Sequence, residues 1–216
     1  MTRLLIATRN AHKVEEIGAI LGESFQFLTL KDFSNAPKVV EDADTFAGNA
    51  TKKAAELARW LATDDSDFKN KNSKPDFVLA DDSGLEVDAL NGAPGVLSAR
   101  FAALDKDENS PDADNNAKLL RLLKTVPAGK RTARLRCVIA LVEIDPPPSL
   151  RHTQIFDGVC EGKIIFEPRG QNGFGYDPLF VPDGYEQSFA ELGEEVKNQL
   201  SHRAKALARL EAGLRT

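Results

Sequence analysis

The chain has 216 residues, of which 42% are hydrophobic and 28% are charged, and this balance is typical of a globular protein with a real core. Its formal net charge of -5 argues against broad electrostatic binding to DNA or RNA. No apolar run approaches the roughly 20 residues that cross a bilayer, and the apolar part of the N-terminus is too short for a signal peptide. We therefore expect one domain over residues 1–216, located in the cytoplasm, with neither a membrane nor a nucleic acid as its partner.

Two cysteines occur, Cys137 and Cys160, and both lie in apolar, strand-like segments. A cytoplasmic location favours free thiols over a disulfide. No cysteine and histidine have the spacing of zinc ligands. We expect both cysteines to be reduced and to lie in or near the core.

The first half of the chain predicts a strand, a tight turn and two helices. The apolar run Leu4–Thr8 is typical of a buried strand, and Asn10 is a candidate N-cap for a helix that contains Val14, Ile17 and Leu21. Such a turn exposes backbone N–H groups and the positive end of a helix dipole, where phosphate can bind. Further elements follow in chain order: an extended segment around Val39 and Val40, a helix from Asp44 or Thr45 to Leu61, and a polar surface loop over Thr63–Asp76.

The second half predicts more strand than the first. The apolar strand Phe77–Ala80 runs into Asp81 and Asp82, and a glycine-containing loop follows through Gly95. Helices interleaved with strands, together with an antiparallel pair, predict a mixed α/β fold. The remaining elements are a helix over Ala113–Leu123, a strand over Thr132–Ile144 that Pro146, Pro147 and Pro148 end, a strand over Gln154–Glu167 broken near Gly158 and Gly162, a loop over Gly170–Pro182, and a helix over Ser201–Leu214.

Polar residues at the first turn are candidates for phosphate binding. Thr8, Arg9 and Asn10 offer donors at the turn, and Lys13 lies in the first helical turn, from which it can reach a phosphate. The alternative is a simple helix cap with an exposed lysine. The residues alone leave both interpretations open.

Acidic residues cluster at two places. Glu41 and Asp42 precede the second helix, where carboxylates suit the helix dipole without any function. Asp81 and Asp82 follow a buried strand, where two adjacent carboxylates are costly unless they are solvated, paired or bound to a metal. Because successive strand residues face opposite sides, we expect only one of this pair to point at a ligand.

The last two motifs combine glycines, aromatic rings and cations. Gly170–Asp177 contains three glycines, which permit close approach of the backbone to a ligand, and Phe174 and Tyr176 offer flat faces for a base. The alternative is an irregular loop with one aromatic residue in the core. Further along, Lys197 precedes Ser201, a candidate cap, and His202 and Arg203 occupy the first helical turn, where a cation opposes the dipole unless an anionic or hydrogen-bonding partner is near.

These motifs occur in an order that resembles the inosine triphosphate pyrophosphatase family. The matching stretches are TRNxxK, ExxxTFxxNAxxKA, LADDSGLEVDALNGAPGVLSARFA, NGFGYDPLF and KNQLSHRAKAL, and they extend from near residue 4 to about residue 207. The resemblance implies a central mixed sheet flanked by helices, with two lobes and a cleft between them. It also implies a homodimer, a Mg²⁺ cofactor, and cleavage of ITP, dITP and XTP between the α and β phosphates to give the monophosphate and pyrophosphate.

The resemblance also assigns roles to single residues. Asp82 matches both a metal-binding carboxylate and the proton acceptor, and the sequence leaves open whether it is base, ligand or both. Lys13 and Lys53 can balance the remaining charge. The full set that carries over is Thr8, Arg9, Asn10 and Lys13 for the triphosphate, Glu41 and Asp82 for the metal, Ser83 for a substrate contact, Phe174, Gly175, Tyr176 and Asp177 for the base and sugar, and Lys197, His202 and Arg203 for selection of the purine.

Two positions depart from the pattern of this family. Arg9 stands where glycine is usual, and Gly48 stands where glutamate is frequent, with Asp42 or Asp44 as candidates to replace that carboxylate. Two other functions remain open on the sequence. One is a nucleotide-binding module without catalysis, and the other is a pyrophosphatase for other modified nucleotides.

Overall fold

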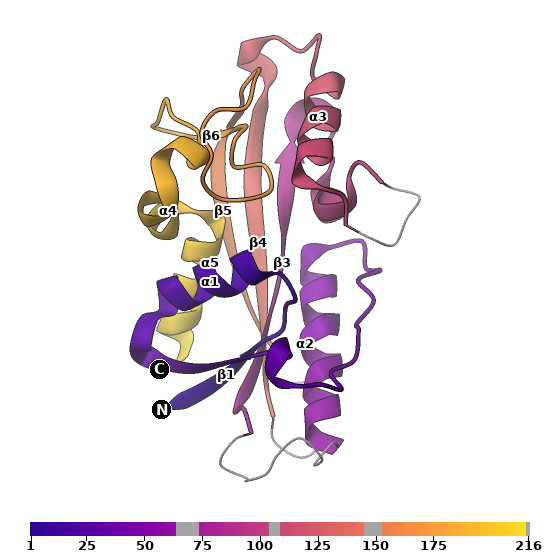
Figure 1. The fold of residues 1–216 in the computed structure, drawn as a ribbon, viewed down its shortest axis with the longest axis vertical. Helices are drawn as coiled ribbons and strands as arrows, with labels where there is room; N and C mark the ends of the chain where they lie inside the picture. Colours follow the sequence, from indigo (N-terminus) through magenta and orange to yellow (C-terminus); the bar gives the residue numbers. More distant parts are fainter. Residues whose placement is uncertain (64–73, 104–108, 145–152, 215–216) are drawn as a thin grey trace. The chain divides into compact units, whose positions relative to one another are not determined.

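The computed structural model describes residues 1–63, 74–103, 109–144 and 153–214. These residues form a six-stranded sheet in the order β2-β1-β3-β4-β5-β6, with helices packed against it (Figure 1). β1 is parallel to β2 and β3, whereas β5 and β6 are antiparallel, so the predicted mixed α/β fold is confirmed. The strands are β1 (Thr2–Ile6), β2 (Phe25–Thr29), β3 (Phe77–Val87), β4 (Thr132–Glu143), β5 (Gln154–Ile164) and β6 (Phe180–Pro182).

The chain divides into two compact units, each assembled from separate segments. The first unit contains Met1–Asp82, Val138–Asp157 and Ala206–Thr216, and the second contains Ser83–Cys137 and Gly158–Lys205. Along the chain, β3 passes from the first unit into the second between Asp82 and Ser83. A single domain with a cleft between two lobes stays a prediction.

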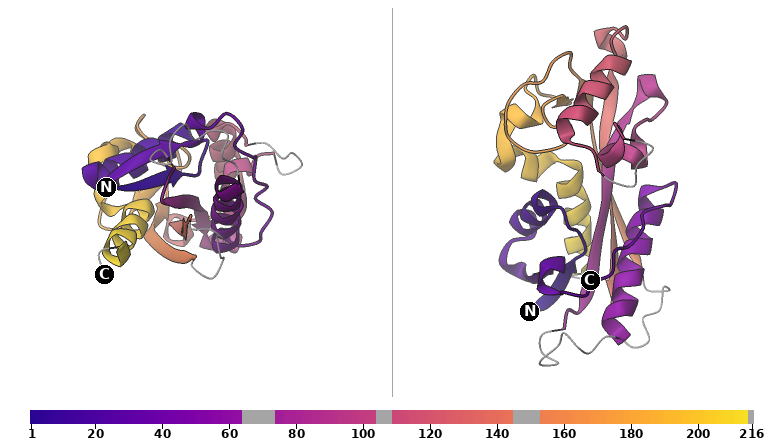
Figure 2. Two further views of the ribbon diagram at one scale, coloured as in Figure 1. Left: turned by 90° about the horizontal axis from the view of Figure 1, so that it is seen from below. Right: turned by 45° about the vertical axis from the view of Figure 1, so that its right-hand side comes forward.

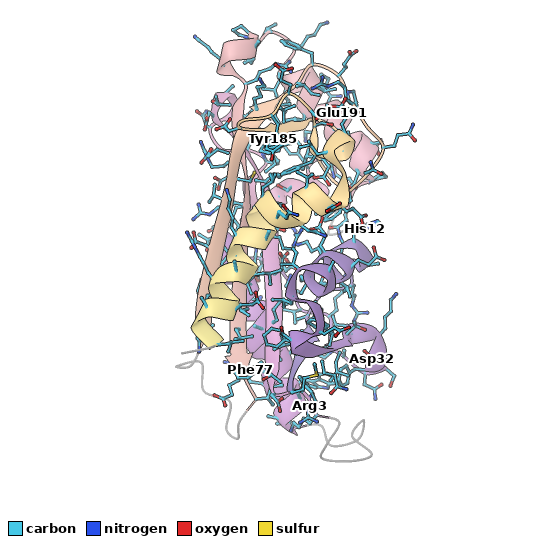
Figure 3. All side chains as sticks on the ribbon, turned by 90° about the vertical axis from the view of Figure 1, so that its left-hand side faces the viewer. Arg3, His12, Asp32, Phe77, Tyr185 and Glu191 are labelled. Carbon is cyan, nitrogen blue, oxygen red and sulfur yellow. The ribbon has the colours of Figure 1, made fainter. Side chains whose placement is uncertain are left out.

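In the first unit, helices cover both faces of the parallel strands. α1 (Ala11–Leu21) lies on one face and α2 (Phe46–Thr63) on the other (Figures 1 and 2). Leu4, Leu5 and Ile6 of β1 are at most 1% exposed, because a strand covered on both faces buries successive side chains. At the start of the strands, Arg3 lies beside Phe77 (Figure 3) and forms a salt bridge of 3.1 Å with Asp76.

The second unit has its own hydrophobic core. α3 (Asp112–Leu122) and α4 (Phe189–Leu200) belong to this unit, and α5 (His202–Leu214) begins in it and ends in the first unit. Capping explains where α4 starts, since the Ser188 hydroxyl accepts from the Glu191 N–H and the Glu191 carboxylate accepts from the Ser188 N–H. The core consists of Leu85, Val87, Phe101, Leu119, Leu123, Ala133, Leu135, Cys160, Ile164, Tyr176, Leu179, Phe180 and Phe189.

The predicted end of the third strand at Ala80 is wrong, because β3 continues to Val87 and includes Asp81–Gly84. β1 pairs with β3 only as far as Leu79, but β4 is the other neighbour of β3 in the sheet. Pairing with a strand that comes much later in the chain leaves no local signal in the sequence. The two carboxylates therefore lie inside a strand, just beyond its last pairing with β1.

Other predicted elements also differ from the structure. β5 runs unbroken through Gly158 and Gly162. A side chain at Gly162 would collide with the backbone of β6 at Val181, so this glycine allows close strand pairing and does not interrupt the strand. β2 and α4 had no counterpart among the predicted elements, and β6 lies within the predicted loop Gly170–Pro182.

Several other predictions are confirmed within a few residues. α1, α2, α3, β4 and α5 match predicted elements, and Cys137 and Cys160 are both buried. The proline run Pro146–Pro148 and most of the Thr63–Asp76 loop lie outside the described residues. Among the residues that are described, no helix is both long and apolar enough to cross a membrane.

Candidate active site

The turn between β1 and α1 is held by its own polar side chains. The Thr8 hydroxyl accepts from the Asn10 N–H at 3.2 Å, and the Asn10 side chain accepts from the Lys13 N–H at 3.2 Å. Asn10 is therefore the N-cap of α1, as predicted. The Lys13 ammonium forms an ion pair with Asp81. Arg9 is exposed and donates to the Ala36 carbonyl at 3.1 Å, which ties this turn to the segment that leads to Glu41.

Asp81 and Asp82 contact different helices. Asp81 pairs with Lys13 of α1, whereas Asp82 accepts from the Asn49 amide of α2 at 3.0 Å. The alternation of side chains along a strand produces this division, because α1 and α2 cover opposite faces. Both carboxylates are buried, with Asp81 1% and Asp82 7% exposed.

Glu41 contacts the same helix as Asp82. The Glu41 carboxylate accepts from the Lys53 ammonium at 2.8 Å. Lys53 lies four residues after Asn49, so the two side chains lie on one face of α2. α2 therefore presents one contact to Asp82 and one to Glu41 from adjacent turns.

The electrostatic environment changes the acidity of Asp82. The pKa of Asp82 is raised to about 6, because burial, with a smaller effect from the charge of Glu41, outweighs the opposite effects of Lys13, Lys53 and the Asn49 hydrogen bond. A carboxyl group with this pKa takes up and releases a proton near neutral pH. Shifted groups of this kind are frequent at catalytic sites, although structural ion pairs produce them too.

The acidic side chains near the start of α2 are candidate metal ligands. Glu41 and Asp82 are close enough for the charge of one to affect the other. Within the described ranges, no group of three His, Cys, Asp or Glu side chains could share a metal ion. Asp42 is exposed and accepts from Lys52 at 2.6 Å, a hydrogen bond that lowers its pKa.

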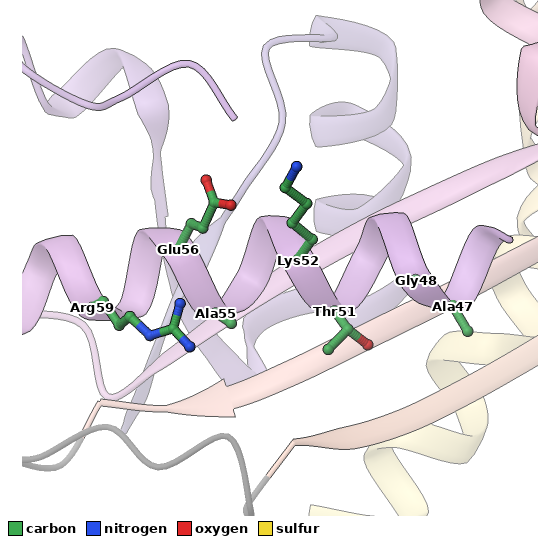
Figure 4. Close-up of a pocket in the computed structure, with 7 residues that line it drawn as sticks. All are labelled: Ala47, Gly48, Thr51, Lys52, Ala55, Glu56 and Arg59. Carbon is green, nitrogen blue, oxygen red and sulfur yellow. The ribbon is translucent and has the colours of Figure 1, made fainter. Parts of the chain in front are cut away.

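Gly48 has a packing role in this chain. A Cβ atom at position 48 would lie 2.7 Å from the Ala43 Cβ and 3.0 Å from the Thr45 hydroxyl, so a side chain here requires a shift of the preceding loop. Gly48 also borders a hollow of about 460 Å³ along α2 (Figure 4). That hollow is lined by Ala47, Gly48, Thr51, Lys52, Ala55, Glu56 and Arg59, and includes neither Asn49 nor Lys53.

In the second unit, cationic side chains gather around one aromatic ring. The Lys197 ammonium lies 4.4 Å and the Arg203 guanidinium 5.8 Å from the centre of the Phe174 ring. Arg203 also donates to the Ser83 hydroxyl at 2.9 Å. His202 precedes Arg203 at the start of α5 and is 5% exposed. The structure thus brings Ser83, Phe174, Lys197 and Arg203 together.

Asp177 and Tyr176 fix the loop that carries Phe174. Asp177 accepts from the Lys197 ammonium at 2.6 Å and from the Phe174 N–H at 2.9 Å. Tyr176 lies in the hydrophobic core, and its hydroxyl donates to the Ser98 carbonyl at 2.9 Å. Burial raises the pKa of this hydroxyl, so it stays protonated. Of Phe174 and Tyr176, Tyr176 is therefore the one in the core. This agrees with the alternative interpretation of the segment as an irregular loop with one aromatic residue in the core.

One residue that contacts Asp82 was not predicted from the sequence. Asn49 is 1% exposed, donates to Asp82, and accepts from the Ala43 N–H at 2.9 Å. It therefore connects Asp82 with the loop that carries Glu41. The four-residue spacing from Lys53 was visible in the sequence, but its two partners come from separate segments.

Comparisons with known proteins agree with this arrangement. The Ham1 family pattern matches residues 4–212. A dITP/XTP pyrophosphatase from Geobacter sulfurreducens is 49% identical over 97% of this chain and 95% of its own, and one from Desulforamulus reducens is 48% identical over 95% of this chain and 92% of its own. A solved HAM1 protein from Coxiella burnetii is 37% identical, with a TM-score of 0.79 over 99% of this chain and 98% of its own.

Proposed function

The chain belongs to the Ham1 family, and we propose that it is a nucleoside triphosphate pyrophosphatase for purine nucleotides with altered bases. Its substrates in this proposal are dITP, XTP and ITP, and its products are the nucleoside monophosphate and pyrophosphate. The names of the relatives support the substrate class. The observation that carries the proposal is that Glu41 and Asp82 lie close to each other and to Lys13 and Lys53. Hydrolysis of a polyphosphate needs both positive charge for its oxygens and a base for the attacking water.

The donor set near α2 fits Mg²⁺. Mg²⁺ prefers carboxylate, water and phosphate oxygens, and it usually takes only one or two carboxylates from the protein. Glu41 and Asp82 are two such carboxylates. When bound, Mg²⁺ would neutralise charge on the phosphate oxygens and on the leaving pyrophosphate.

The side chains of the first unit suit the hydrolytic step. Asp82, with a pKa of about 6, is ionised at neutral pH and can accept a proton from the water that attacks the α phosphorus. The bond from the α phosphorus to the bridging oxygen breaks, and pyrophosphate leaves with the electron pair. Lys13 and Lys53 supply positive charge for phosphate oxygens, and the N–H groups at the start of α1 are further donors.

The side chains of the second unit suit recognition of a purine. Phe174 offers a ring for stacking, and Lys197, His202 and Arg203 are donors that match the 6-oxo group of hypoxanthine or xanthine better than the 6-amino group of adenine. A base without an acceptor at that place would leave buried donors unpaired. Selection thus comes from hydrogen bonding and not from size alone.

The family resemblance extends this proposal to a homodimer in the cytoplasm, where the nucleotide pool is found. The mass in solution, measured by light scattering after gel filtration, should correspond to two chains. A monomeric particle at micromolar concentration would contradict the dimer and leave the reaction untouched.

A product-resolved assay tests the function. Pyrophosphate and monophosphate are measured with dITP, XTP, ITP, ATP and GTP, in the presence of Mg²⁺ and again with a chelator. We expect equal amounts of both products from dITP, XTP and ITP, loss of activity with chelator, and far slower turnover of ATP, whose adenine lacks the 6-oxo group. Release of orthophosphate, or equal turnover of ATP, would exclude the proposed reaction or its selectivity.

A further inference from the structure

Gly175 is hydrogen-bonded through both of its backbone groups to α3. Its N–H donates to the Asp112 carboxylate at 2.6 Å, and its carbonyl accepts from the Asn116 amide at 3.0 Å. Asp112 and Asn116 are four residues apart, so one face of α3 provides both contacts. We propose that Asp112 and Asn116 are positioning residues that fix the Phe174–Asp177 loop and thereby determine the affinity for the purine base.

The loop needs this restraint because of its backbone conformation. Gly175 has a φ of 65° and Gly173 a φ of 76°, values that glycine adopts readily along with many others. Each free glycine therefore gives the loop alternative conformations, and those conformations would carry the Phe174 ring to different places. Tyr176 anchors the loop on the side after Gly175, through its core ring and its bond to Ser98. On the side that carries Phe174, the α3 contacts act together with the Asp177 carboxylate, which accepts from the Phe174 N–H.

The hydrogen bonding of the Asn116 side chain argues for a positioning role. It is 8% exposed, and its side-chain oxygen has no hydrogen-bond partner among the described residues. One hydrogen bond contributes about 0.5–1.5 kcal/mol, whereas an unsatisfied buried acceptor costs about 1–3 kcal/mol. The net effect of this amide on folding is therefore small or unfavourable, and its evident contact is with Gly175.

The neighbouring Asn115 provides the contrast. Its oxygen accepts from the Ala102 N–H at 2.8 Å, and its amide group donates to the Ala99 carbonyl at 3.3 Å. Asn115 is 3% exposed and thus satisfies both ends of its amide within the fold. Two adjacent buried asparagines on α3 therefore differ, since Asn115 stabilises the segment before α3 and Asn116 holds the aromatic loop.

The experiment compares four variants of the full chain. Asn116→Leu removes the donor to Gly175, and Asp112→Ala removes the acceptor. Asp112→Asn keeps an acceptor oxygen without the charge, and Asp114→Ala removes an exposed charge from the same helical turn without touching Gly175. Steady-state kinetics with dITP, hydrogen–deuterium exchange of the peptide around Gly175, and thermal unfolding are measured for each.

We expect KM to rise by roughly twofold to tenfold for each lost hydrogen bond, with kcat little changed. Backbone exchange around Gly175 should accelerate in Asn116→Leu and Asp112→Ala, and less so in Asp112→Asn. Asp114→Ala should match the wild type in exchange and KM, and Asn116→Leu should unfold no more than a few degrees below the wild type. Unchanged exchange around Gly175, or faster exchange with an unchanged KM, would overturn the proposal.

This inference rests on the proposed function, in which Phe174 contacts the base, but the two fail in different ways. If the wild type does not hydrolyse dITP, XTP or ITP, the proposed function fails. KM is then replaced by the dissociation constant of dIMP, and the exchange measurement stands unchanged. If the wild type is active and the variants keep its KM, only the positioning role is lost.

Discussion

The Asp82 region and the Phe174 loop place their side chains by different physical means. Asp82 sits in a regular strand, and charged and amide side chains from two helices surround it. Phe174 sits in an irregular loop with glycines at positive φ, where most of the restraint comes from hydrogen bonds to the backbone. Around Asp82, charged side chains are positioned by a regular strand and its helices, whereas in the Phe174 loop the backbone conformation itself positions an aromatic ring.

Because of this difference, we expect substitutions near Asp82 to affect the rate of chemistry and substitutions in the Phe174 loop to affect substrate affinity. In the Asp82 region, a side chain can change while the strand persists, so chemistry should fall without loss of fold. Removing a buried carboxylate with a raised pKa should even stabilise the protein. In the Phe174 loop, a change alters backbone conformation first, so substrate affinity should fall before the rate of chemistry.

The largest effect is expected at Asp82 itself. Asp82→Asn keeps the shape and removes both the charge and the proton acceptor, so kcat with dITP should fall by about a thousandfold or more. Asp88→Asn is a matched control, because Asp88 directly follows the same strand and is exposed. Its carboxylate accepts hydrogen bonds from Thr132 and Arg134. If Asp82→Asn turned over dITP at more than a tenth of the wild-type rate, Asp82 would not be the base.

Stability should respond to pH in a way that identifies the same carboxyl group. The pKa of Asp82 is raised from 3.8 to about 6 in the folded protein. The protonated carboxyl group therefore adds to the free energy of unfolding below pH 4, and this stabilisation is lost as the pH rises through 6. This loss is of the order of 3 kcal/mol. Urea unfolding without metal should show Asp82→Asn gaining stability over the wild type between pH 4 and pH 7. A difference between the two proteins that stays constant with pH would contradict the raised pKa.

A smaller effect is expected at Asn49, which connects Asp82 to the loop of Glu41. Asn49→Ser loses both hydrogen bonds. If Asp82 holds a metal ion as proposed, kcat/KM should fall by roughly tenfold to a hundredfold, the usual effect of losing the partner of a metal ligand. Asn115→Ser is the control, since the hydrogen bonds of that buried amide to described residues go to backbone groups. Equal losses of activity in both variants would mean that Asn49 acts only through stability.

The smallest effect is expected in the loop. Gly175→Ala adds a methyl group that meets no atom of the described residues within 4 Å, so the strain comes from the φ of 65°. This strain is about 1–2 kcal/mol, and KM should rise by about fivefold to thirtyfold with kcat preserved. Gly129→Ala, also in open space but without a positive φ, should leave both constants unchanged. A fall in kcat with unchanged KM would show that the loop does not act through affinity.

The sequence predicted what local patterns determine. α1 and its Asn10 cap were evident because the cap, the first turn and the apolar face are neighbours in the chain. The continuation of β3 through Asp81 and Asp82 was not evident, since its support comes from β4. α4 was missed although Ser188 and Glu191 have the spacing of a capping box, because Gly193 interrupts the helix at a φ of 80°.

The candidate site divides in the same way. Residue types indicated Asp82, Lys13, Phe174 and Lys197 as candidates. In the structure, Asp82 accepts from Asn49, Lys13 pairs with Asp81, and Lys197 lies over the Phe174 ring. Asn49, Asp112 and Asn116 were not found, because an amide or a carboxylate on a helix surface has no special signal. Their contacts lie far away in the chain and become visible only after folding.

The central claim is that Glu41 and Asp82 hold one divalent cation, and a titration with Mn²⁺ followed by electron paramagnetic resonance tests it most directly. The account predicts one site in the wild type, at least about tenfold weaker binding in Glu41→Gln and in Asp82→Asn, and wild-type binding in Asp42→Asn, whose carboxylate pairs with Lys52. Wild-type affinity in both Glu41→Gln and Asp82→Asn, or an equal loss in Asp42→Asn, would contradict it.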